Sequence, residues 1–130
     1  DLYFVKAIEA APYILDFRSA YAGFLVAQGR LEEAEEQYQF SLKENDEHAE
    51  SLNGLGYIYL NFGRFQEAEE LFDQCLQLEP DHVLCRINKV LVHLQLENEK
   101  GLKRDLNYLK VYHADNQKVQ QLINHLERGN

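Results

Sequence analysis

Apolar side chains recur at helical spacing in segments along the chain, and short turn-forming stretches separate these segments. The first segment, DLYFVKAIEAAP (1–12), is apolar at this spacing and ends at a proline. Near the other end, segment 116–128 places Val119, Leu122, Ile123 and Leu126 on one helical face. The pattern predicts an all-α fold.

An internal repeat organises the segments between these ends. Residues 29–36 read GRLEEAEE and residues 63–70 read GRFQEAEE, so six of eight positions are identical when the chain is displaced from Gly29 to Gly63. Tyr38 pairs with Phe72 under the same displacement, and Ser41 with Cys75. A period of this length indicates a stacked supersecondary unit.

Residues 49–82 resemble the tetratricopeptide repeat, a family of 34-residue helix pairs. The matching positions are Leu52 at the usual Trp, Leu55-Gly56 at the Leu-Gly pair, Tyr59, Ala68, Phe72 and Pro80. Small Gly56 and Ala68 would let the two helices approach closely, and Gly63 would end the first helix in a left-handed conformation. The resemblance implies a right-handed α-solenoid of antiparallel helix pairs, a superhelix of about seven to eight helices.

The period divides the chain, which we expect to form a single domain over residues 1–130. The expected parts are repeat 1 at 15–48, repeat 2 at 49–82, a degenerate repeat 3 at 83–115 and a capping helix at 116–128. One period before Asp46 stands Pro12, so segment 1–12 resembles the second helix of a further repeat, with Phe4 and Ala7 facing inward.

Repeat 3 allows two helix registers. Strict register places Arg86, Lys89 and His93 at core sites of the first helix. A one-residue shift, with a deletion near 97–101, places an apolar set there instead. Because burying unpaired cations is costly, we expect the shifted register, in which the buried residues are Ile87, Val90, Leu91 and Leu94.

The charge balance limits the possible partners. The net charge is −9 and the sequence pI is about 4.9, which argues against nucleic acid as a partner. Residues 1–82 carry 5 Lys and Arg against 17 Asp and Glu, whereas residues 83–130 carry 8 against 5. This asymmetry is either that of solvated helix faces or a basis for end-to-end homo-oligomers.

Targeting signals give little further direction. No apolar run reaches the roughly 20 residues of a membrane-spanning helix, so we expect no membrane insertion, and no segment has the pattern of a signal peptide. The compartment stays open, with the cytoplasm favoured.

No motif in the sequence points to catalysis. Walker, dinucleotide, nucleophile-elbow and HExxH patterns are absent, and the five histidines have no metal-ligand spacing. Cys75 and Cys85 are expected to be free core thiols. We therefore expect no catalytic residues, no cofactor and no metal, and a protein that is not an enzyme.

The family resemblance implies a binding surface on the concave side, lined mainly by repeat positions 2, 5, 9, 12 and 13. The candidate binding residues are Ser19, Glu50, Asn53, Tyr57, Asn61 and Asn88, and in the shifted register Val92 and Gln95 lie beside Asn88. Amides, one aromatic ring and small apolar side chains suit an extended peptide.

We expect a protein–protein interaction scaffold that binds a peptide or a partner helix. Two alternatives stay open: a self-associating assembly module, and the regulatory or targeting arm of a larger multidomain enzyme. The residues of the carboxylate clamp that holds acidic chaperone tails in this family are missing here, since Ser19, Gly23, Gly54 and Leu84 stand at clamp positions.

Overall fold

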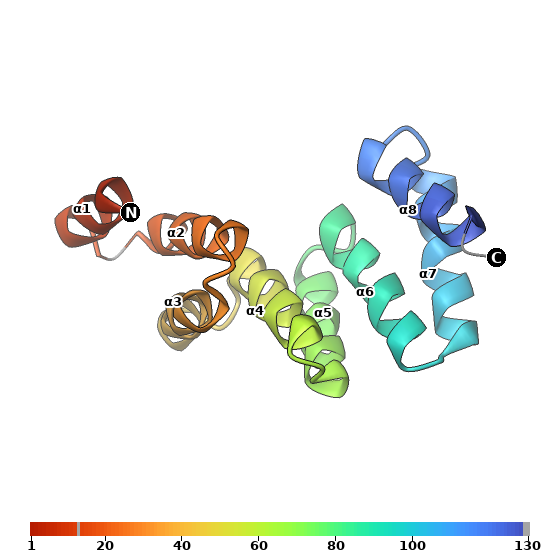
Figure 1. Cartoon of the computed structure of the whole chain (residues 1–130), viewed down its shortest axis with the longest axis horizontal. Coiled ribbons are helices and arrows are strands. Elements are labelled where there is room, and N and C mark those ends of the chain that lie inside the picture. The colour runs from red at the N-terminus through yellow and green to blue at the C-terminus, as the bar shows by residue number, and fades with distance from the viewer. Residues whose placement is uncertain (13, 129–130) are drawn as a thin grey trace.

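The structure, a computed structural model, describes residues 1–12 and 14–128. Every regular element in these two ranges is an α-helix, and the helices follow one another along the length of the molecule (Figure 1). Their bounds are α1 Leu2–Ala10, α2 Leu15–Ala27, α3 Leu31–Glu44, α4 Ala49–Asn61, α5 Phe65–Leu78, α6 Val83–Gln95, α7 Glu99–Tyr112 and α8 Gln117–Arg128.

The repeat period of the sequence runs through all eight described helices. We call α2, α4, α6 and α8 the A helices; they begin at Leu15, Ala49, Val83 and Gln117, and each start lies one full period after the start before it. We call α1, α3, α5 and α7 the B helices; they end at Ala10, Glu44, Leu78 and Tyr112, again one period apart. The register therefore extends to both end helices, beyond the segments where sequence identity reveals it.

Helix packing alternates between two kinds of neighbour. α2, α4 and α6 each pack against the B helix that follows, and α1, α3 and α5 each pack against the A helix that follows. Successive A helices also touch, α2 with α4 and α4 with α6. The A helices therefore lie side by side in a row, and one face of that row stays uncovered by B helices.

Turns between A and B helices use left-handed backbone. Gly29 has φ +75° and Gly63 has φ +79°, which confirms the prediction for Gly63. The equivalent residue in the third pair is Glu97, with φ +54°. A side chain in this region costs roughly 1–2 kcal/mol, so the third turn keeps the same geometry at a higher cost.

Two glycines on α4 face aromatic rings on its two neighbours. A Cβ at Gly56 would lie 2.6 Å from the ring of Phe72 on α5, and a Cβ at Gly54 would lie 2.2 Å from the ring of Tyr38 on α3. Phe72 is fully buried. The close approach predicted for Gly56 is therefore confirmed, and Gly54 provides the same on the opposite side of the helix.

The first helix packs onto α2 through aromatic contacts. The ring of Phe4 lies 5.7 Å from that of Tyr21 and 5.5 Å from that of Phe24, measured between centroids. Ile8 joins the same core and Ala7 is half-buried. Phe4 thus faces inward as predicted.

The shifted register expected for repeat 3 is wrong. α6 begins one full period after α4, and α7 begins one full period after α5, so no residue is deleted between them and the repeat keeps its full length to residue 116. Leu94, expected in the core, is 44% exposed, whereas Lys89 and His93 are only 5% and 1% exposed. Of the expected apolar set, Val90 alone is fully buried.

Strict register is tolerated because carboxylates meet the buried basic side chains. On α6, Lys89 donates to Asp73 of α5, and His93 Nε2 lies 2.8 Å from Oδ2 of Asp105 on α7. The side chain of Asp105 is 2% exposed, and Arg86 Nη1 lies 3.2 Å from its Oδ1. The cost that favoured the shift applies to unpaired charges, and these charges are paired.

The last described helix, α8, packs on the third helix pair. Val119 and Leu122 of α8 are buried against Val90 and Leu109, in a second core cluster that also takes in Ile123 and Leu126. Polar residues cover the rest of the helix, where Gln120, Gln121, Asn124 and Glu127 are all exposed. α8 therefore has one apolar, buried face and one polar, exposed face.

Within residues 1–12 and 14–128, no helix has both the length and the apolar content needed to cross a membrane.

We predict that Gly56→Ala destabilises the protein by about 1–3 kcal/mol, because the new methyl group must displace the buried Phe72 ring. Gly23→Ala is the matched control on α2, since its nearest contact is the Tyr38 hydroxyl at 3.9 Å. Urea denaturation measures both variants. Equal midpoints for the two variants would contradict the packing argument.

We predict that Asp105→Ala costs about 3–5 kcal/mol, because it removes the buried carboxylate that Arg86 and His93 share. Glu99→Ala on the same helix removes a solvent-exposed pair with Lys103, so it should leave the unfolding midpoint nearly unchanged. Chemical denaturation of both variants checks the difference. A loss below about 1 kcal/mol for Asp105→Ala would show that the buried network contributes little.

Candidate functional site

The uncovered face of the A-helix row carries two adjoining hollows. The first, which we call the central pocket, has a volume of about 490 Å³ and takes side chains from all four A helices. The second, which we call the edge pocket, has a volume of about 440 Å³ and lies between α4 and α6 near their carboxyl ends. Tyr57, 39% exposed, lines both pockets and joins them.

A pair of asparagines crosses the central pocket. Asn88 Nδ2 on α6 donates to Asn53 Oδ1 on α4 over 2.9 Å. The side chains that line the pocket are those of Val26, Tyr38, Asn53, Tyr57, Leu84, Asn88 and Lys118, together with Gly23 and Gly54. Within the described chain, Asn53 Nδ2 and Asn88 Oδ1 have no hydrogen-bond partner. One donor and one acceptor therefore lie side by side at this pocket.

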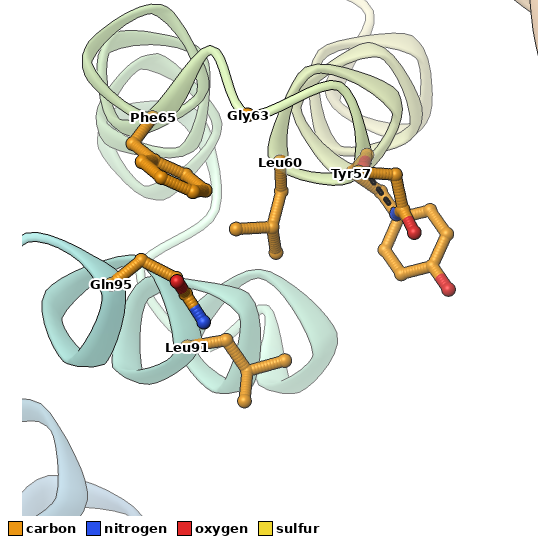
Figure 2. A pocket seen from close by; sticks show the side chains of 7 residues that line it. Tyr57, Leu60, Gly63, Phe65, Leu91 and Gln95 are labelled. Atoms are coloured by element: carbon orange, nitrogen blue, oxygen red, sulfur yellow. Dashed lines mark hydrogen bonds between the residues drawn. The ribbon is translucent and has the colours of Figure 1, made fainter.

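Apolar side chains shape the edge pocket. Figure 2 shows Leu60 of α4 and Phe65 of α5 pointing toward α6, which carries Leu91 and Gln95. Asn61 also borders the pocket, and its Nδ2 donates to the backbone oxygen of Tyr57 over 2.8 Å. The edge pocket thus combines an apolar centre with amide groups at its rim.

Tyr38 reaches the central pocket from α3, with its ring against Gly54. Burial raises the pKa of this phenol to about 12, and the nearby carboxylate of Glu50 adds to the effect. The phenol is therefore neutral at physiological pH and available as a hydrogen-bond donor or acceptor.

Residues 25–83 match the family model described as tetratricopeptide repeat. A search of curated proteins finds no match. The chain contains tetratricopeptide repeats.

Solved structures share the fold over most of this chain. A tetratricopeptide repeat protein from Parabacteroides merdae is 22% identical, with a TM-score of 0.79 over 93% of this chain and 47% of its own. YrrB, described as a TPR protein with an unusual peptide-binding site, is 21% identical, with a TM-score of 0.81 over 92% of this chain and 61% of its own.

A third similar structure is a single domain. The second TPR domain of human RPAP3, solved in complex with an HSP70 peptide, is 15% identical, with a TM-score of 0.72 over 85% of this chain and 92% of its own. These similarities confirm the predicted all-α solenoid. The chain spans about half of the Parabacteroides protein and three-fifths of YrrB.

Four of the six predicted binding residues border the pockets on the tetratricopeptide repeat surface. Asn53, Tyr57 and Asn88 line the central pocket, and Tyr57 and Asn61 line the edge pocket. Ser19 borders neither; its Oγ donates to the backbone oxygen of Asp16.

Glu50, the sixth, is engaged by a histidine in a contact that repeats along the row. His82 Nε2 lies 3.0 Å from Glu50 Oε1, and His48 Nε2 lies 3.1 Å from Asp16 Oδ1 one repeat earlier. Each histidine precedes an A helix and contacts an acidic residue at position 2 of the A helix before it. These contacts tie successive repeats together.

Glu50, Glu79 and His82 have the spacing of a three-ligand metal group, but hydrogen bonding accounts for the histidine. His82 Nδ1 accepts from the backbone N–H of Cys85 over 3.1 Å, so the proton of the neutral ring lies on Nε2 and is donated to Glu50. A metal at Nε2 would force that proton onto Nδ1, against the N–H group. The arrangement is therefore a helix cap with an acidic partner.

The two cysteines are free and fully buried, as predicted. Cys85 Sγ donates to the backbone oxygen of Phe72 over 3.2 Å. The pKa of the Cys85 thiol is far above its usual range; the larger cause is a hydrogen bond with Cys75 and the smaller is burial. A thiol that stays protonated is a poor nucleophile.

Sequence reasoning missed or misplaced several pocket residues. Val92 was expected on the concave face but is fully buried, because the strict register turns it into the core. Leu84 and Leu91 line pockets in that same register, at positions 2 and 9. Lys118 was missed because segment 116–128 was treated only as a cap; counting one further period on from Leu84 finds it.

We predict that Tyr38 ionises only near pH 12, because its pKa is raised from an ordinary value of 10.0 to about 12. The fold favours the neutral phenol, so this contribution to stability is complete below pH 10 and is lost as the pH rises toward 12. The phenolate absorbance of wild type minus that of Tyr38→Phe isolates the residue. A midpoint near pH 10 in the difference curve would contradict the buried site.

Proposed function

We propose that this chain is a non-catalytic scaffold that binds a peptide or a partner helix across the central and edge pockets. The observation that carries the proposal is the asparagine pair. Asn53 and Asn88 each use one amide atom on the other, which leaves one donor and one acceptor next to each other. An extended peptide offers N–H and C=O groups in the same alternation.

The pockets supply the second element of peptide recognition, which is space for side chains. Leu60, Phe65 and Leu91 give the edge pocket an apolar floor. Tyr57 stands between the two pockets, where an aromatic ring can pack against a bound chain with little loss of its own freedom. Similar proteins support this use of the fold, since the RPAP3 domain is described in complex with a peptide and YrrB as having a peptide-binding site.

The helix order supports the division into repeats that the sequence predicts. α1 packs on α2 as α3 packs on α4, and its last residue keeps the register of the other B helices. We propose that α1 occupies the place of a B helix in a further repeat. Its residues Leu2 and Tyr3 are 66% and 79% exposed, so α1 carries apolar surface that α2 does not cover.

The polar outer face of α8 weighs against end-to-end association of copies. Gln120, Gln121, Asn124 and Glu127 are exposed there, so the apolar side of α1 in a second copy would meet polar surface. Association of that kind would bury little apolar area on one side. This is why we favour the scaffold over the assembly module.

We predict that Asn53→Ala/Tyr57→Ala abolishes or strongly weakens peptide binding, because the double variant removes one amide of the pair and the ring between the pockets. A 12-residue peptide library would be selected on the immobilised wild-type chain. Affinities of the enriched peptides would then be measured by fluorescence polarisation. We expect losses of more than about tenfold, which corresponds to roughly 1.4 kcal/mol or more.

Phe40→Ala is the matched control. Phe40 on α3 is 39% exposed, like Tyr57, but borders neither the central nor the edge pocket. Peptides that bind the double variant as tightly as wild type, or that lose affinity equally for Phe40→Ala, would place the binding surface elsewhere.

A further inference from the structure

The first turns of the four A helices present a graded row of side chains. Position 2 of successive A helices is occupied by Asp16, Glu50, Leu84 and Lys118. The side chains of Asp16 and Glu50 are 84% and 63% exposed, Leu84 is 39% exposed, and Lys118 is exposed. The row thus runs from two negative charges through an apolar side chain to one positive charge.

Asp16 and Glu50 each have a carboxylate oxygen that can bind a cationic group. Each gives one carboxylate oxygen to a histidine, Asp16 Oδ1 to His48 and Glu50 Oε1 to His82, and the other oxygen has no hydrogen-bond partner within the described residues. Their exposure leaves these oxygens open to a cation in solution.

Lys118 is the basic residue at the other end of the row. Its Nζ takes part in no ion pair of the described chain, and it borders the central pocket together with Leu84 and Asn88. The charge gradient therefore ends at the same pocket that holds the asparagine pair.

We propose that the central pocket binds an extended peptide of one charge order, with a basic residue over α2 and α4, an apolar residue at Leu84 and an acidic residue at Lys118. This inference rests on the proposed function. Neighbouring packed helices lie roughly 10 Å apart, and an extended chain advances about 3.3 Å per residue. The three ligand residues are therefore spaced about three positions apart.

Charge complementarity sets where each ligand residue lies, because opposite charges meet at both ends of the row in this placement and like charges would meet if the basic residue lay at Lys118 and the acidic residue at Asp16 and Glu50. The peptide lies across the A helices, so its backbone passes the free donor of Asn53 and the free acceptor of Asn88. Either chain direction satisfies these two groups, whereas only one arrangement of charges satisfies the row.

The test uses three synthetic probes labelled for fluorescence polarisation. The ordered probe is acetyl-Ser-Lys-Ser-Ala-Leu-Ser-Ala-Glu-Ser-amide. The permuted probe exchanges its Lys and Leu, and so has the same composition and net charge. The swapped probe replaces Glu in the ordered probe by Lys. We expect wild type to bind the ordered probe at least about fivefold more tightly than the permuted one.

Charge reversal in the protein identifies the contact. Lys118→Glu should weaken the ordered probe about fivefold relative to wild type and strengthen the swapped probe by a similar factor. Lys103→Glu on α7 is the matched control, because it changes the net charge equally at a site that borders neither pocket. Equal affinity for ordered and permuted probes, equal effects of the two reversals, or no binding of the ordered probe would overturn the proposal.

Different results would contradict peptide binding at the asparagine pair and the charge order along the row. If library peptides depend on Tyr57 and Asn53 but the ordered probe shows no preference, the groove binds peptides without this charge order. If the ordered probe binds in a Lys118-dependent manner and Asn53→Ala/Tyr57→Ala has no effect, the row is a site but the asparagine pair is not part of it.

Discussion

The structure depends on how closely an A helix can approach its B helix neighbours. On α4, Gly56 lies against the ring of Phe72 and Gly54 lies against the ring of Tyr38, at separations that no Cβ would allow. A ring that fills the space left by a missing side chain fixes both the distance and the relative position of two helices along their axes. Because the arrangement involves both neighbours of α4, the central repeat transmits its geometry to the helix before it and to the helix after it.

The third helix pair reaches the same geometry by different chemistry. Where the central pair has Leu52, Leu55 and Tyr59, the third has Arg86, Lys89 and His93. Asp105 of α7 contacts Arg86 and His93, and Asp73 of α5 contacts Lys89. The backbone register is kept, so it does not depend on apolar side chains at these positions. It is compatible with buried basic side chains that each meet a carboxylate where the central pair has hydrocarbon contacts.

Local sequence was enough to predict much of this architecture. The GRLEEAEE and GRFQEAEE segments reveal the period, and the left-handed turn at Gly63 and the inward position of Phe4 follow from it. The register of α6 could not be predicted in this way, because the partners that make Lys89 and His93 acceptable lie 16 and 12 residues away on other helices. The rule that a buried unpaired charge is costly was applied to each residue alone, and it does not say whether a partner lies on another helix.

The candidate site shows the same limit. Asn53 and Tyr57 of α4 and Asn88 of α6 could be placed on the concave side by counting repeat positions. Lys118 could also have been found by counting one period on from Leu84, but the hydrogen bond between the two asparagines depends on how far the superhelix curves. Curvature is the sum of small rotations between pairs, and single-sequence patterns do not contain it.

The charged contacts between α5 and α6 also specify which repeats can be neighbours. If α6 stacked on α3 instead, Lys89 and His93 would face the residues equivalent to Asp73 and Glu69, which are Gln39 and Glu35. Lys89 would then lose the close carboxylate of Asp73 and keep only one equivalent to Glu69, whose Oε2 lies 3.9 Å from Lys89 Nζ in the native array, so the misassembled array would stabilise the buried charge less well. The protein is made of similar units whose apolar faces could pack in several orders. This charged cluster favours the order in which the third pair stacks on the second.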